Sequence, residues 1–238
     1  MWTERLWAAL DNGVAGGKWF SLIDQGSAPK MLQAAWERVA ATGGAAGVDR
    51  LSLDRGRAKA QQYRAELSQA LQEGRYQPLA VRRVQIPQGP GQTRPLGIPA
   101  VNDRIVQTAL QLVLEPLFER EVRPPSCGLR PGRGGKDALR AVAELRKAGD
   151  TSVVEADLTS YFDTIPQAPV LAAVKSRGSD RRVLDLRQSC LEQDLVEDRR
   201  CGRPTQGTPP GAVLRPLLAN RYRHPLDLLM EQEGHPLR

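Results

Sequence analysis

Apolar residues recur about every three or four positions in several segments of this chain, as they do along one face of an amphipathic helix. The first such segment runs from Lys30 to the glycines of ATGGAAGVD, and the second ends at Gly74, a position suited to a left-handed helix cap. We therefore predict two helices in this part of the chain. Their apolar positions are Leu32, Ala35, Trp36 and Val39 in the first, and Tyr63, Leu67, Ala70 and Leu71 in the second.

The pattern changes in the next segment, LAVRRVQIP, where Val81, Val84 and Ile86 fit an extended strand. The residues QGPGQ separate this strand from TRPLGIP, which fits the second strand of a hairpin. Because proline has no N–H group to donate to a neighbouring strand, Pro95 places the second strand at the edge of its sheet.

Helical spacing returns after the predicted hairpin. Asn102 or Asp103 can cap a helix that Pro116 should kink or end, and GKDALRAVAELRKAG repeats the helical pattern until it stops at a glycine. Two more helices are predicted over about 166–175 and 181–191. The segment DRRCGRPTQGTPPG then predicts a polar loop, and AVLRPLLANRYRHPLDLLM a helix bent by its two prolines.

The segment TSVVEAD predicts a short apolar strand that ends in the carboxylate of Asp157. A carboxylate at a strand end can meet a hard cation such as magnesium, with the backbone carbonyl of Leu158 as a second oxygen ligand. A strand-terminal aspartate is also commonly a helix cap or a turn former. Asp163 fits this structural role still better, because a turn into a helix follows it.

The composition favours a folded protein with a polyanionic partner. A hydrophobic content of 40% and a charged content of 26% are those of a globular domain. The net charge of +7 favours RNA or DNA, although charge alone does not exclude an acidic membrane surface. Basic residues gather in one stretch, which is either a nucleic-acid contact or a solvated face. They are Arg120, Arg123, Arg130, Arg133, Lys136 and Arg140.

Cysteines and histidines are too few and too scattered for a structural zinc site. The cysteines are Cys127, Cys190 and Cys201, and there are two histidines. The chain has no signal-peptide pattern at its start and no run of roughly 18 apolar residues. We therefore expect a cytoplasmic protein that does not cross a membrane.

Several blocks in the same order resemble the reverse transcriptases of bacterial group II introns, also called intron maturases. The resemblance covers residues 13–238 or so and is carried by AAWERVAATGGAAGVD, VRRVQIPQGPGQTRPLGIPAVNDRIVQTALQLVLEPLFE, SCGLRPGRGGKDALR, VVEADLTSYFDTIP and GTPPGAVLRPLLANRYRHPLD. It implies an α+β fold of the right-hand polymerase type. Mostly helical fingers with a β-hairpin would occupy about 30–150 and a partial palm about 151–238, after an N-terminal extension over 1–29.

The resemblance also implies RNA-directed DNA synthesis by a mobile element that assists the splicing of its intron. The partners would be intron RNA, an RNA template with a DNA primer, and deoxynucleoside triphosphates, and the cofactor would be Mg²⁺. Arg123, Arg130, Arg133 and Lys136 are the expected contacts to RNA phosphates.

Specific roles follow from the resemblance for several residues. Asp157 would bind catalytic Mg²⁺ together with Leu158 and a later aspartate from a Tyr-Ala-Asp-Asp block. Phe162 resembles the aromatic gate that excludes a ribose 2′-hydroxyl, although a core aromatic is the alternative. Arg94 would grip the incoming triphosphate, and Gln88 stands where the family usually has a second cation, a lysine.

Other departures from the family gather near the same substrate. Pro210 stands where the family usually has glutamine, and Arg215 where it usually has serine. Cys127 and Leu129 replace an expected aromatic pair. We expect Pro210 to lie beside the nucleotide.

The second catalytic block does not occur in this sequence, since the 238 residues contain no Asp-Asp pair. We therefore expect a fingers and partial palm fragment, without thumb or maturase regions, that is inactive alone. The alternative is a non-catalytic RNA-binding remnant of a decayed or interrupted intron-encoded gene. The sequence alone leaves open whether the chain is an enzyme.

Overall fold

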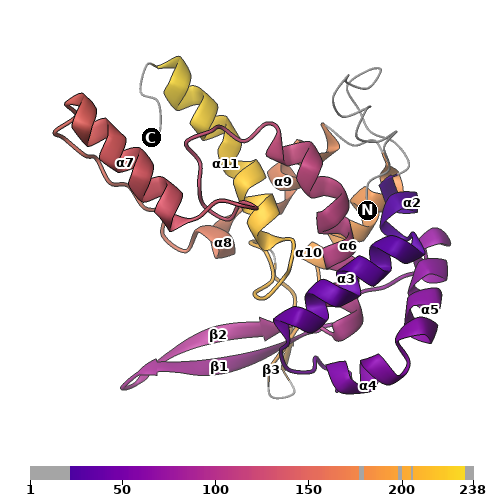
Figure 1. Ribbon diagram of the computed structural model, residues 1–238. Coiled ribbons are helices and arrows are strands. Elements are labelled where there is room, and N and C mark those ends of the chain that lie inside the picture. The colour runs from indigo at the N-terminus through magenta and orange to yellow at the C-terminus, as the bar shows by residue number, and fades with distance from the viewer. Residues whose placement is uncertain (1–21, 177–179, 198–199, 205, 234–238) are drawn as a thin grey trace.

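The computed structural model describes residues 22–176, 180–197, 200–204 and 206–233. Most of the predicted N-terminal extension, residues 1–21, lies outside them. The helices in chain order are α2 (Leu22–Gly26), α3 (Pro29–Thr42), α4 (Leu53–Ala58), α5 (Ala60–Gln72), α6 (Val101–Glu119), α7 (Gly135–Ala148), α8 (Tyr161–Thr164), α9 (Gln167–Lys175), α10 (Arg181–Leu191) and α11 (Arg215–Gln232) (Figure 1). The strands are β1 (Val81–Gly89), β2 (Gln92–Ile98), β3 (Leu195–Glu197) and β4 (Arg200–Gly202).

The two helices predicted first are confirmed as α3 and α5. Their apolar faces point into the core, and Leu32 and Ala35 are fully buried. Gly74 follows α5 with φ +67, the left-handed conformation expected of a glycine at a helix end. The core already includes Leu22 and Ile23 of α2, so the folded unit begins before Lys30.

Helix α6 forms the centre of the fold, with α2 and α3 packed against one part of it and α11 against another. The predicted cap is wrong, because α6 begins after Ala100 and no side chain caps it. Asp103 lies inside the first turn and is buried, where it accepts hydrogen bonds from other elements. The helix also continues through Pro116, which therefore does not end it.

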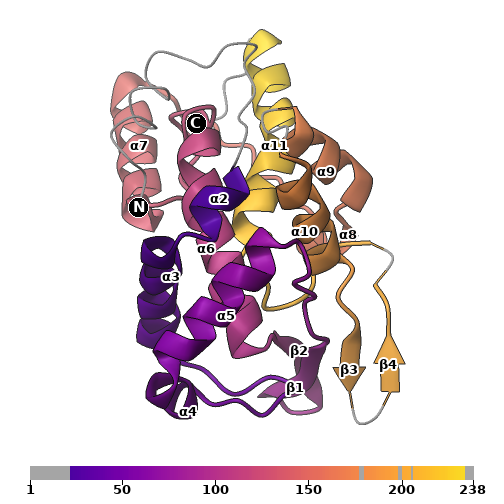
Figure 2. The same cartoon turned by 90° about the vertical axis from the view of Figure 1, so that its right-hand side faces the viewer.

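The predicted hairpin is confirmed as β1 and β2, which project from the helical body (Figure 1). The sheet order is β2-β1-β3-β4, so β2 is an edge strand, as Pro95 predicted. The predicted polar loop is partly wrong, because it contains β4, which pairs with β3 in a second, short hairpin. Strand β3 runs parallel to β1, with Val81 opposite Leu195, and Figure 2 shows the short hairpin beside the base of the long one.

The strand predicted in TSVVEAD is also wrong. Residues 151–157 have no regular secondary structure, and Val153 and Val154 are 86% and 95% exposed. A strand needs a neighbour to accept and donate its backbone hydrogen bonds, and no described strand pairs with this segment. Apolar residues alone therefore do not make a strand here.

The later helices are found where the sequence predicted them, as α9, α10 and α11. Helix α11 contains Pro216 in its first turn and Pro225 in its interior. Helix α7 also forms as predicted and ends at Gly149 with φ +108, but none of its residues is buried. No helix in the described part of the chain is long and apolar enough to cross a membrane.

Candidate functional site

A cavity of about 640 Å³ lies between α11, the segment 156–162 and the connection from α6 to α7. We call this connection, residues 120–134, the strap. Three residues predicted to act together line the cavity, namely Asp157, Leu158 and Phe162. The strap contributes Arg123, Cys127 and Leu129, and α11 contributes Asn220, Arg223, Asp227 and Glu231.

Asp157 is exposed and follows the irregular segment 151–156, so no strand holds its carboxylate in place. Leu158 is 52% exposed beside it. Two further acidic residues line the cavity, but each is paired with an arginine. Arg123 Nε donates to Glu231 at 2.7 Å, and Arg223 Nε lies 3.6 Å from Asp227. In the described ranges no three His, Cys, Asp or Glu side chains are grouped to hold a metal ion. These residues therefore do not make a complete magnesium site.

Phe162 is held by the segment 206–214, which runs against α8. The backbone N–H of Thr208 donates to the Phe162 carbonyl at 3.0 Å, and the N–H of Gly207 donates to the Ile165 carbonyl at 2.8 Å. A Cβ atom at Gly207 would lie 2.6 Å from the Asp163 carbonyl oxygen, so only glycine fits this close approach. The backbone of Phe162 is thus held by main-chain contacts from a distant part of the sequence.

Arg215, the first residue of α11, covers the Phe162 ring. Its guanidinium carbon lies 4.5 Å from the ring centroid, a cation–π distance, and its Nη2 donates to the Asp163 carboxylate at 2.7 Å. Burial lowers the pKa of Arg215, although Asp163 raises it and the nearby charge of Arg94 lowers it further. From the sequence, Arg215 was recognised only as a departure from the family and Asp163 only as a turn former. Their contact was therefore not predicted.

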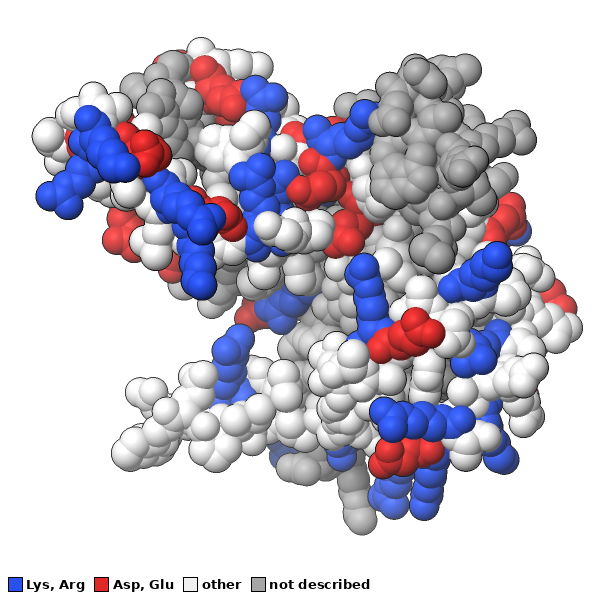
Figure 3. Space-filling model, viewed as in Figure 1, with Lys and Arg blue, Asp and Glu red and all other residues white. Residues whose placement is uncertain are grey.

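The long hairpin carries the other predicted nucleotide contacts. Arg94 on β2 pairs in register with Ile86 and is exposed, and Gln88 lies at an irregularity of β1 between Pro87 and Gly89. Neither lines the cavity of Asp157. Figure 3 shows the molecule hollowed between this hairpin, which carries Arg94, and the lobe above it.

Pro210 lies where the hairpin meets the helical body. Its backbone carbonyl approaches Gly97 of β2 so closely that a Cβ atom on Gly97 would stand 1.9 Å from it. The segment 206–214 therefore contacts two elements. It bonds to the backbone of Phe162 in α8, and it touches β2, which carries Arg94.

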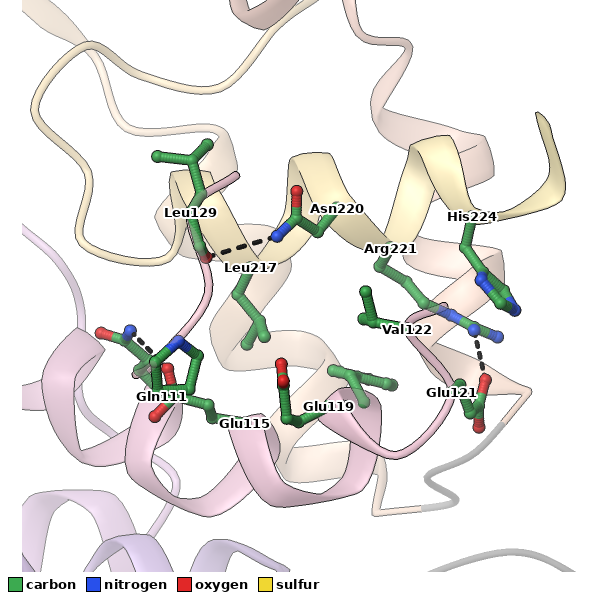
Figure 4. A pocket seen from close by; sticks show the side chains of 12 residues that line it. Gln111, Glu115, Glu119, Glu121, Val122, Leu129, Leu217, Asn220, Arg221 and His224 are labelled. Carbon is green, nitrogen blue, oxygen red and sulfur yellow. Dashed lines mark hydrogen bonds and ion pairs between the residues drawn. The ribbon is translucent and has the colours of Figure 1, made fainter. Parts of the chain in front are cut away.

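The strap uses part of its positive charge internally. The Arg130 side chain is only 7% exposed; it donates to Glu119 and to the backbone carbonyls of Arg123 and Ser126. Asn220 and Arg221 of α11 fasten the strap further, by a bond to the Leu129 carbonyl and an ion pair with Glu121, around the small cavity of Figure 4. Arg133 and Lys136, in contrast, are exposed, although Arg133 Nη1 also donates to the Pro124 carbonyl at 3.1 Å.

A buried polar network supports the base of the hairpin. Asp103 accepts hydrogen bonds from the Tyr76 hydroxyl, the Leu79 backbone N–H at 3.1 Å and Gln193 Nε2 at 3.1 Å. Burial raises the pKa of Asp103 to about 6, although these three hydrogen bonds lower it. Gln107 extends the network by accepting the N–H of Val213 at 2.8 Å. Nothing in the local sequence indicated that these residues meet.

The sequence is similar to those of known proteins. Residues 86–234 match the family described as reverse transcriptase (RNA-dependent DNA polymerase). The chain is 35% identical over 232 residues to Protein YkfC of Escherichia coli (strain K12), covering 95% of this chain and 60% of that protein. It is 32% identical over 168 residues to the group II intron-encoded protein LtrA of Lactococcus lactis subsp. cremoris, covering 70% of this chain and 28% of LtrA. The chain thus spans less than two thirds of the length of these relatives.

A solved structure has the same architecture. A chain of the "Partial Cas6-RT-Cas1--Cas2 complex" matches with a TM-score of 0.60 at 23% sequence identity, over 89% of this chain and 35% of that one. The likeness confirms the predicted α+β reverse transcriptase fold of fingers and palm.

Proposed function

The chain belongs to the reverse transcriptase family, and we propose on that basis that it forms the fingers and part of the palm of a group II intron RNA-directed DNA polymerase. One observation carries the proposal. Asp157, Leu158 and Phe162 line a single cavity, and the hairpin with Arg94 borders the hollow seen in Figure 3. The family relationship also implies a nucleic-acid partner.

For the metal, the family generally uses divalent metal ions. We propose that the Asp157 carboxylate and the Leu158 carbonyl oxygen supply two ligands of a bound Mg²⁺. Because the other acids at the cavity are paired with arginines, the described residues cannot complete its coordination.

For the nucleotide, we propose that Arg94 binds the triphosphate of a deoxynucleotide and that Phe162 excludes a ribose 2′-hydroxyl. The exposed guanidinium of Arg94 suits bidentate phosphate binding, and Phe162, whose backbone is hydrogen-bonded to Thr208 and whose ring face is covered by Arg215, suits a steric gate. Gln88 adds no charge to the site, and Pro210 forms part of the surface between Arg94 and Phe162.

For RNA, we propose that Arg133 and Lys136 contact phosphates of an intron RNA or of an RNA template with its DNA primer. Arg123 and Arg130 contribute indirectly, because their ion pairs hold the strap, which contains Arg133 and leads into α7 with Lys136. The same contacts to intron RNA would also allow the protein to assist splicing.

Direct binding tests the nucleotide proposal without requiring turnover. We expect the chain to bind fluorescently labelled dATP more tightly than labelled ATP in the presence of Mg²⁺, because the Phe162 ring meets the 2′-hydroxyl. Phe162→Ala should bring the two affinities together. Equal affinities in the unaltered chain would contradict the gate.

Anisotropy of a labelled RNA template–DNA primer tests the RNA proposal. Charge reversal of Arg133 and Lys136 to glutamate should weaken binding and reduce the slope of its salt dependence by about 0.7 to 0.9 for each phosphate that is no longer neutralised. Lys175→Glu, an exposed charge reversal on α9, is the matched control. If all three variants bind alike, these residues form only a solvated face.

A further inference from the structure

We propose that Arg215 is a second phosphate-binding residue, which grips the triphosphate of a bound nucleotide together with Arg94. The inference rests on the proposed nucleotide site, and it assigns a cation to that site from a different element. Its basis is the cluster formed by Arg215, Phe162 and Asp163.

The position of Arg215 relates it to both parts of the site. Its guanidinium lies over the Phe162 ring at 4.5 Å, so a phosphate bound there stands beside the proposed gate. The chain between Pro210 and Arg215 connects the contact with Gly97 to the start of α11. Arg94 lies three residues before Gly97 on β2, and its charge lowers the pKa of Arg215, as expected of two cations that lie near each other.

The guanidinium of Arg215 is available for a ligand because its present partners are weak or few. The Asp163 side chain is 66% exposed, so water competes with the ion pair and reduces its strength. Among the described residues, no acceptor bonds the Nε of Arg215, which is buried, so the proposed phosphate contacts are those of the terminal Nη groups. A phosphate can therefore replace the Asp163 carboxylate and accept from the same planar set of donors.

The charge of the site supports the same assignment. Gln88 on the hairpin is neutral, so Arg94 alone would face a triphosphate that carries several negative charges. Two arginines would neutralise more of this charge. Asp163 holds Arg215 in place, and the charges of Arg215 and Arg94 repel each other. A triphosphate between the two arginines would attract both of them.

Binding of dATP and of inorganic tripolyphosphate, measured by calorimetry on the whole chain, tests the proposal. Arg215→Ser should weaken both ligands by about tenfold or more, as expected when a charge-assisted hydrogen bond is removed. Arg181→Ser is the matched control: Arg181 is also the first residue of a helix, is 92% exposed and pairs with a carboxylate four residues later. The control should bind like the unaltered chain.

Two further variants separate a phosphate contact from a role in holding Phe162. Asp163→Asn should increase the affinity for tripolyphosphate several-fold, because it releases Arg215, and this gain should disappear when Arg215→Ser is also present. Arg215→Lys keeps the charge and should retain part of the affinity. An equal gain from Asp163→Asn with and without Arg215 would overturn the proposal, since it would show only a general charge effect.

Substitution of Arg94 separates the role of Arg215 from the nucleotide site as a whole. If Arg94→Ser weakens dATP binding and Arg215→Ser does not, the nucleotide site stands and the role of Arg215 is wrong. If neither substitution changes the affinity, the nucleotide site itself is wrong. Weakening by both, together with the dependence on Asp163, supports both.

Discussion

The carbonyl oxygen of Pro210 lies 1.9 Å from the point where a Cβ atom on Gly97 would stand. The contact is reciprocal, because a Cβ atom on Gly211 would lie 2.0 Å from the carbonyl oxygen of Gly97. Two backbones thus meet where the long hairpin joins the helical body. Any side chain at either glycine must push them apart.

Gly97→Ala should therefore destabilise the fold by about 3 kcal/mol, the upper end of the usual cost of overpacking, because the obstructing atoms are backbone. Urea unfolding measures the loss. Gly89→Ala on the same hairpin is the control, since a Cβ atom there meets nothing within 4 Å. A Gly97→Ala protein as stable as the Gly89→Ala protein would show that the hairpin is not anchored at this point.

Asp103 should make stability depend on pH. Its folded pKa of about 6 lies above the ordinary aspartate value of 3.8, so the folded state binds more protons than the unfolded state between these values. Its contribution is therefore fully present below about pH 4 and is lost as pH rises through 6, by on the order of 3 kcal/mol. Unfolding of the wild type and Asp103→Asn between pH 4 and 7 should show the wild type losing relative stability. A constant difference would contradict the raised pKa.

Arg187 is a fully buried cation on α10. Among the described residues, none accepts a hydrogen bond from its guanidinium, and burial lowers its pKa to about 9. Arg187→Met should raise the free energy of unfolding by about 1–3 kcal/mol, because it removes the cost of desolvating the charge.

The same residue gives a second check. Above pH 9 the unfolded chain binds more protons than the folded chain, so the disadvantage of Arg187 relative to methionine should shrink as pH rises. A less stable Arg187→Met protein would indicate that the buried guanidinium has partners of its own.

The strap should depend on Arg130 much more than on Arg133. Arg130→Ala leaves Glu119 and two backbone carbonyls without their donor and should cost about 2–3 kcal/mol. Hydrogen exchange over residues 123–130 should accelerate in the same variant. Arg133→Ala should change stability by less than about 0.5 kcal/mol, as an exposed substitution does.

Exposed apolar residues beside Asp157 should promote self-association. Val153 and Val154 are 86% and 95% exposed, and Leu139 of α7 is 70% exposed. Replacing both valines by threonine should reduce association in sedimentation experiments. Ile86→Thr removes a 43% exposed apolar residue from the long hairpin and is the control. Unchanged association in the double variant would exclude this segment as its cause.

The sequence predicted those elements whose pattern is local. Alternation and turn residues identified the long hairpin, and the chemistry of Pro95 identified its edge. Apolar residues at helical spacing, followed by a glycine at the helix end, predicted α3, α5 and α7. The short hairpin was missed because strands of three residues carry no distinct pattern and exist here through pairing, β3 with β1 and β4 with β3.

Elements that depend on distant partners could not be predicted. Val153 and Val154 suggested a strand, but a strand forms only beside another, and the sequence cannot supply that information. Asp103 was expected to cap a helix, whereas its partners Tyr76 and Gln193 come from separate elements. For the site, Asp157, Leu158 and Phe162, to which the resemblance assigns related roles, line one cavity, but the contact of Arg215 with Phe162 emerges only from the fold.

The parallel pairing of β1 with β3 limits the order in which the chain can fold during its synthesis. Gln193, just before β3, bonds to the backbone carbonyl of Leu79, which lies 114 residues earlier. The N–H of Ile23 bonds to Asp180, which is 157 residues later. The emerging chain can form α3, α5 and the long hairpin early, but the base of that hairpin stays unpaired on one side until β3 has left the ribosome. A pause in translation before β3 would therefore prolong the interval in which this sheet edge is open to other chains.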